Sequence, residues 1–316
     1  MVDFLYKPIG VQIALFALST FVFSSCLNDK KGSLTDAPGQ KPVTSCVSLG
    51  LPQNLPTRGT ATVFFPDPIG YSGNPNLSPS SLHLDDFTTQ VELENLSGKG
   101  VLEGKYVTAR NGYCSGEEFG AFDPGNTFIY RHSDPHFQEA MAYFFGDQYR
   151  KMLDASLVLE PKKSVEIVTH CAWGDNSYYA RSGTSPLDVV EYVCLFDSAA
   201  TPGASYSDDA AVTVHELQHA TTENTYNPNP QVSLGTYEYD EGGALNEAIS
   251  DFMALIYTAP MVTDGIDARV FSRWALGTFL PQRKYIRGAH RCPQYDSTFP
   301  NCSNFNTNPF SAANNT

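Results

Sequence analysis

The strongest constraint in this sequence is a short histidine motif, H-E-x-x-H, at residues 215–219. On an α-helix, side chains four residues apart lie on the same face, so His215 and His219 can bind one metal ion together. This spacing suits zinc, which binds histidine nitrogens at about 2.0–2.1 Å. Glu216 follows the first histidine and is placed to take a proton from a water on that metal. The alternative is an exposed amphipathic helix that carries two solvated histidines.

A second stretch, residues 240–257, favours the metal site. Its apolar residues recur at helical spacing: Leu245, Ile249, Phe252, Met253 and Ile256. Glu247 and Asp251 are four residues apart and therefore share a face of this helix. Glu247 can supply the third protein ligand of a zinc site with one open position, and Asp251 can accept the free N–H of a ligand histidine. The alternative is that both carboxylates only solvate the outer face of the helix.

These two stretches together resemble one protein family. H-E-L-Q-H-A at 215–220 and E-G-G-A-L-N-E-A-I-S-D at 241–251 are similar to the motifs of the thermolysin-like zinc metallopeptidases, with the fungalysins as more distant relatives. The resemblance covers roughly residues 170 to 290. It implies that His215, His219 and Glu247 are zinc ligands and that Glu216 is the general base. It also implies that Asp251 and Asn246 are hydrogen-bond partners of the ligand histidines.

The resemblance implies an α+β fold of two lobes. A mixed α/β N-terminal lobe would be followed by a helical C-terminal lobe, with the H-E-x-x-H helix between them. We expect four segments along the chain: a lipoprotein-type signal peptide at 1–25, a flexible tether at 26–58, the α/β lobe at 59–206, and the zinc-binding helices with a partial helical lobe at 207–316.

Further site residues follow from the same resemblance. Residues 176–179 are similar to an edge-strand motif that holds the substrate peptide, so Asn176 is a candidate substrate-binding residue, although a plain turn asparagine is an alternative. Tyr237 or Tyr239 would stabilise the tetrahedral intermediate, unless they are packed aromatic residues. Arg287, or Arg283 as second choice, would support the substrate carbonyl oxygen.

The chain also departs from the family in two ways. The positions that match the family's double calcium site carry no carboxylate, so we predict one zinc ion and no double calcium site: Ala211, Thr258, Arg273, Ala275 and Thr278. The late histidine segment that would stabilise the oxyanion is missing, since His290 is the only histidine after the zinc motif. We therefore expect a C-terminally truncated sequence or a weakened enzyme.

The N-terminus indicates export. Lys7 precedes an apolar run at 9–23, which is short for a membrane span but normal for a signal peptide, and the run ends in a lipobox-like sequence at Cys26. We expect a bacterial lipoprotein at the outer membrane or cell surface, attached to the membrane through a lipid on Cys26. An uncleaved anchor, or an ordinary signal peptide with secretion or a periplasmic location, is the alternative.

Cysteine count and charge agree with this location. Removing Cys26 from the seven cysteines leaves six, which is compatible with three disulfides, and Cys292–Cys302 is our first expected pair. Free buried thiols are the alternative. The net charge of −14 argues against nucleic acid as a partner. The family resemblance implies a peptide or protein substrate, and we expect a monomer.

Hydrophobic patterns predict the remaining elements. Strands are expected at 61–65, 90–96, 105–109, 164–172, 177–181 and 189–196. Helices are expected from residues 133–135 onward, with Ser133 and Asp134 as caps, and at 267–280. Residues 207–209 should cap the helix that carries the zinc motif. His132 and His136 are also four apart, but without a glutamate between them we assign them capping or surface roles.

Taken together, the sequence predicts a zinc metalloendopeptidase that acts on extended peptides outside the cytoplasm. The alternative is a catalytically impaired, zinc-binding surface lipoprotein that acts as a binding protein.

Overall fold

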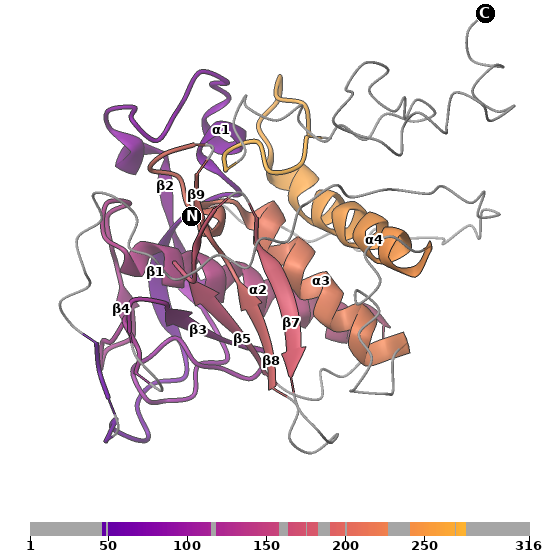
Figure 1. Ribbon diagram of the computed structural model, residues 1–316. Coiled ribbons are helices and arrows are strands. Elements are labelled where there is room, and N and C mark those ends of the chain that lie inside the picture. Colours follow the sequence, from indigo (N-terminus) through magenta and orange to yellow (C-terminus); the bar gives the residue numbers. More distant parts are fainter. Residues whose placement is uncertain are drawn as a thin grey trace, which may run out of the picture.

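The computed structural model describes residues 46–48, 50–114, 118–157, 164–174, 176–182, 190–199, 201–226, 241–268 and 270–275. The predicted signal peptide, Cys26, Tyr237, Tyr239 and Arg287 lie outside these residues, as does Arg283. The described part is a mixed α/β structure with four α-helices, which is compatible with the predicted α+β class (Figure 1).

A four-stranded sheet forms the centre of the molecule, in the order β3-β5-β8-β7. Its strands are β3 Val107–Asn111, β5 Val165–Thr169, β8 Val190–Cys194 and β7 Tyr178–Ser182. The first three run parallel, with Val107 opposite Val165 and Ile167 opposite Val193. Strand β7 is antiparallel to β8 and lies at one edge of the sheet, with Tyr178 opposite Cys194.

Two smaller sheets extend this core. One has the order β2-β1-β4, with β1 Gly59–Phe64, β2 Thr88–Leu93 and β4 Thr127–Phe128. The other pairs β6 Trp173–Gly174 with β9 Asp197–Ser198. The predicted strands are confirmed to within a few residues, whereas β4, β6 and β9 are too short to give a periodic signal.

The helices are α1 Pro68–Ser72, α2 His136–Leu157, α3 Ala210–Tyr226 and α4 Glu241–Thr258, with 3₁₀ turns at Leu84–Phe87, Tyr206–Asp208 and Ala259–Met261. Helix α2 follows β4 and precedes β5 in the chain, and it contacts β3, β5, β1 and α3. Its side chains Phe137, Met141, Phe145 and Tyr149 are fully buried. Helix α3 lies beside α2 against β7 and β8, and α4 lies on α3 (Figure 1). The helix with the H-E-x-x-H motif is therefore central and buried.

The helix starts follow the predicted caps. Asp134 accepts a hydrogen bond from the backbone N–H of His136 (2.9 Å), where α2 begins. Asp209 accepts one from the N–H of Ala211 (3.0 Å) and caps α3. Asp208 instead forms a capping box with Ser205 around the preceding 3₁₀ turn.

One predicted element is wrong over its described part. Residues 267, 268 and 270–275 form turns and irregular structure rather than the expected helix. Arg273 donates hydrogen bonds to the carbonyls of Asp267 and Val270, and Ser272 has a positive φ of 49°, so the chain folds back on itself. Trp274 is buried, but by a turn rather than by a helical face.

Two disulfides link segments of the described chain: Cys46 to Cys114 and Cys171 to Cys194. They favour an extracellular or otherwise oxidising environment. Cys292 and Cys302, our first expected pair, lie outside the described residues. Within the described segments, no helix is long and apolar enough to span a membrane.

Candidate metal centre

Three side chains converge between α3 and α4. His215 Nε2 lies 3.1 Å from His219 Nε2 and 3.3 Å from Glu247 Oε2, and His219 Nε2 lies 3.5 Å from Glu247 Oε1. Among the described residues, these three form the group whose ligand atoms lie close enough together to hold one metal ion. Ligand atoms at about 2.0–2.1 Å from a tetrahedral zinc are about 3.3 Å from one another. The three observed separations agree with this value, so the residues fit zinc.

The local sequence explains this convergence. The two histidines are one helical turn apart on α3, and α4 presents Glu247, Ser250 and Asp251 at helical spacing on the face turned toward them. The His215 and His219 side chains are only 6% and 9% exposed, so the alternative of two solvated histidines is wrong. Glu247 is 29% exposed, and the centre is therefore reached from solvent on its side.

The second ring nitrogen of each histidine also has a partner on α4. His215 Nδ1 lies 2.8 Å from Asp251 Oδ1, and His219 Nδ1 lies 3.1 Å from Ser250 Oγ. Asn246 also forms a side-chain hydrogen bond with His219. With the proton on Nδ1, each ring turns the lone pair of Nε2 toward the point where the three ligands meet.

The electrostatics favour a cation at this point. Burial disfavours a charged His215, but Asp251, Glu247 and Glu216 outweigh it and raise the pKa of His215 to about 10. Burial and the neighbouring His215 lower the pKa of His219. The carboxylates thus stabilise one positive charge among the three ligands, a role that a metal ion fills when it displaces the proton.

The wall of the centre contains residues that the sequence did not single out. The Phe271 ring lies 5.2 Å from the His215 ring. Ser250 was also missed, because its partner lies on another helix. The signal that could have found it is its position three residues after Glu247, on the same helical face.

For the other predicted site residues, the structure gives their position and burial. Glu216 is buried on α3 beside His215, with 5% of its surface exposed. Asn176 lies half-buried just before the edge strand β7. At the expected calcium positions, Ala211 and Ala275 are buried, and Arg273 Nε lies 3.3 Å from Asp67 Oδ2. The absence of a double calcium site stays a prediction.

A second set of histidines lies near the start of α2. His132 and His136 are not surface residues, because their side chains are 13% and 11% exposed. His132 Nε2 lies 3.2 Å from Asp208 Oδ2, and His136 Nδ1 lies 2.8 Å from Glu139 Oε1. The assigned surface role is wrong because each imidazole pairs with a carboxylate whose side chain has no exposed surface.

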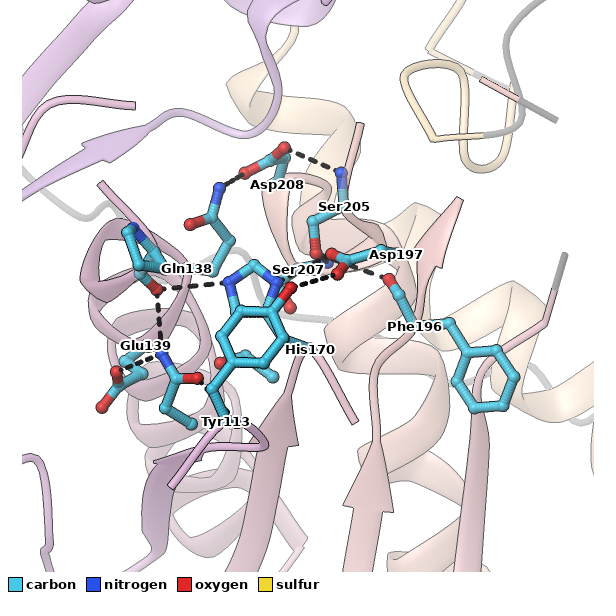
Figure 2. A network of polar contacts seen from close by, with 12 residues as sticks. Tyr113, Gln138, Glu139, His170, Phe196, Asp197, Ser205, Ser207 and Asp208 are labelled. Carbon is cyan, nitrogen blue, oxygen red and sulfur yellow. Dashed lines mark hydrogen bonds and ion pairs between the residues drawn. The ribbon is translucent and has the colours of Figure 1, made fainter. Parts of the chain in front are cut away.

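His170 was not predicted at all. It pairs with Asp197 through Nδ1 at 2.8 Å, and Figure 2 shows its ring stacked on Tyr113. Its Nε2 lies 3.3 Å from the carbonyl oxygen of Pro135. These contacts join the end of β5 to β9 and to the start of α2.

Comparisons with known proteins add no family to this geometry. No protein-family model matches the chain, and no curated protein shows significant similarity to it.

Proposed function

We propose that this protein is a zinc-dependent metalloendopeptidase that hydrolyses extended peptides outside the cytoplasm. The observation that carries the proposal is the convergence of His215, His219 and Glu247 at tetrahedral separations, with Glu216 buried on the same helix. A structural zinc site has four protein ligands and needs no base, whereas three ligands beside a glutamate are typical of hydrolytic centres.

His215, His219 and Glu247 would hold the zinc ion, which would supply Lewis-acid chemistry: polarisation of the scissile carbonyl and a lowering of the pKa of a bound water toward about 7. Glu216 takes a proton from the attacking water and delivers it to the nitrogen of the leaving amine. The edge strand β7 is available for backbone pairing with an extended substrate, next to Asn176. Tyr237 or Tyr239 and Arg287 remain the proposed groups that stabilise charge on the carbonyl oxygen.

The proposed setting is outside the cytoplasm, with Cys26 as the lipid attachment site. Two disulfides support the oxidising compartment, and the lipobox-like sequence supports the anchor. The acidic net charge supports a monomer that does not bind nucleic acid.

The test is hydrolysis of a quenched fluorescent peptide library by the purified protein, with zinc content measured on the same samples. Glu216→Gln should lower kcat by about 10²–10⁴-fold and leave zinc bound, because the general base is lost but all three ligands remain. Glu92→Gln is the matched control, since that glutamate lies on β2 with 73% of its side chain exposed.

Zinc at one ion per chain without any cleavage would contradict the peptidase and favour the zinc-binding lipoprotein. Cleavage that survives Glu216→Gln would contradict the role of the base. A folded protein that does not take up zinc would overturn the metal centre itself.

A further inference from the structure

The two ligand histidines have different partners behind them. His215 faces a carboxylate, Asp251, at 2.8 Å, whereas His219 faces a neutral hydroxyl, Ser250 Oγ, at 3.1 Å. A hydrogen bond to a charged acceptor is about twice as strong as one between neutral groups. The two imidazoles are therefore held, and made basic, to different degrees.

A serine at position 250 is less favourable for helix stability than an alanine would be. It lies inside α4 with no exposed surface, where alanine is the better helix former and leaves no hydroxyl to satisfy. A buried hydroxyl needs a hydrogen-bond partner, and the partner that lies 3.1 Å away is the Nδ1 of a metal ligand. The contact crosses from α4 to α3, so it is not a local bond within the helix.

A hydroxyl at position 250 also adds no negative charge to the metal centre, unlike a carboxylate. Asp251, Glu247 and Glu216 already bring carboxylates to the two histidines, and they are the groups that favour a cation on His215. A carboxylate at position 250 would add another buried negative charge with no cation of its own. Ser250 can accept the Nδ1 proton of His219 without this cost.

We propose, on the basis of the proposed zinc peptidase, that Ser250 is a positioning residue of His219, in addition to Asn246. Its Oγ accepts the Nδ1 proton and fixes the tautomer whose Nε2 lone pair points at the metal position. Because its partner is neutral, His219 is the weaker of the two imidazole ligands, and His215, with Asp251 behind it, is the stronger.

The experiment measures the zinc dissociation constant of the purified protein by competition with a chromophoric chelator. Ser250→Ala should weaken zinc binding by about 10–100-fold, the usual effect of losing an outer-shell partner. Ser250→Thr keeps the hydroxyl and should restore binding toward the wild-type value. Asp251→Ala should weaken binding more than Ser250→Ala does, because it removes the charged partner.

Thr258→Val is the matched control on the same helix. Thr258 is 1% exposed, and its hydroxyl bonds only to the Ala254 carbonyl of α4 itself at 2.9 Å. This variant should bind zinc within twofold of wild type. The absorption spectrum of the cobalt-loaded protein is a second readout, which Ser250→Ala should change and Thr258→Val should not.

The melting temperature of each zinc-free variant distinguishes a role of Ser250 in positioning His219 from a role in protein stability alone. A purely structural role would lower the zinc-free melting temperature of Ser250→Ala without changing its zinc affinity, and this result would overturn the proposal. The zinc peptidase would still stand in that case. If the wild type itself binds no zinc, the proposed function fails and the role of Ser250 fails with it.

Discussion

Two buried histidine–aspartate pairs in this molecule have the same nitrogen–oxygen distance and different surroundings. His215–Asp251 and His170–Asp197 both join Nδ1 to a carboxylate oxygen at 2.8 Å. Behind His170, the other nitrogen meets the Pro135 carbonyl, which is also an acceptor. Both nitrogens of His170 must then carry protons, so no lone pair is left for a metal.

His215 differs because its second nitrogen meets other metal-binding atoms. Its Nε2 faces His219 Nε2 and a Glu247 oxygen, and the proton that it carries there can be exchanged for a cation. The partner of the second nitrogen, rather than the His–Asp pair, therefore distinguishes a ligand from a structural histidine.

The two pairs also connect different parts of the fold. The His170–Asp197 pair joins the end of β5 to β9 (Figure 2), and the second nitrogen of His170 contacts the Pro135 carbonyl at the start of α2. Near that point, Asn111 and Ala121 donate hydrogen bonds to Glu139. The His215 pair joins α3 only to α4. We therefore expect the first to determine stability and the second to determine zinc binding.

The largest expected difference between the two pairs comes from replacing the histidine of each pair by asparagine. His215→Asn should abolish stoichiometric zinc binding and peptide hydrolysis, because it removes a ligand from a three-ligand site. His170→Asn should keep zinc but lower the free energy of unfolding by about 3–5 kcal/mol, since Asp197 is left buried without its cation. Asparagine tolerates the positive φ of 52° at position 170, so the backbone is not the cause of the loss.

Zinc content, hydrolysis rate and urea unfolding of the two variants are the measurements. A stable His170→Asn protein that has lost zinc would show that both pairs serve the metal. A His215→Asn protein that keeps one zinc ion per chain would remove His215 from the ligand set.

The sequence predicted the part of the centre that depends on local geometry. His215 and His219 share a helical face at any position in a fold, and Glu247 with Asp251 repeats that argument on a second helix. The pairing of the two helices followed from the need of a zinc site for a third protein ligand, and the family resemblance supported it. Ser250 was missed although its position three residues after Glu247 places it on the same helical face, because that position alone does not identify the residue opposite it on α3.

The His170 network could not be predicted for a different reason. Its members Tyr113, Pro135, His170 and Asp197 are brought together by the strand order of the sheets, which no local pattern encodes. The missed turn at 271–275 shows that hydrophobic spacing alone can mislead, because Phe271 and Trp274 are buried without a helix.

Removing the metal tests the different roles of the two histidines, because the loss in free energy of unfolding shows which variants bind zinc. Zinc that binds the folded state alone stabilises it by about 4 kcal/mol when free zinc exceeds the dissociation constant a thousandfold. Wild type and His170→Asn should both lose this amount in a chelator, and His215→Asn should lose nothing. Urea unfolding with zinc and with chelator gives the three differences, and equal losses in all three variants would place the zinc elsewhere.

The smallest expected effects are two pH dependences of opposite direction. The stability that the His170 site contributes should fall as pH rises, whereas the zinc affinity of the His215 site should increase. Burial opposes the charged form of His170, but Asp197 outweighs it and raises the pKa of that histidine, and Asp208 and Glu139 do the same for His132 and His136. A raised folded pKa means that the stabilisation is complete below the unfolded value of about 6.5 and is lost as pH rises through the folded value.

Stability of the zinc-free protein should therefore fall as pH rises above about 6.5, by at most about 1.4 kcal/mol per pH unit for each group that releases its proton. Asp209 acts in the same direction at lower pH, since burial and the Asp67 charge raise its pKa to about 7. Zinc affinity should instead rise with pH, because zinc displaces the proton that His215 holds with a pKa of about 10.

Urea unfolding of His215→Asn across this range isolates the structural histidines, because the titrating ligand is gone. Adding His170→Asn should flatten the curve, and chelator competition on wild type should give a dissociation constant that decreases as pH rises. If the free energy of unfolding of His215→Asn does not change with pH while His170 is present, the imidazole paired with Asp197 is neutral. The two pairs would then differ only in that His215, unlike His170, faces two further metal-binding side chains.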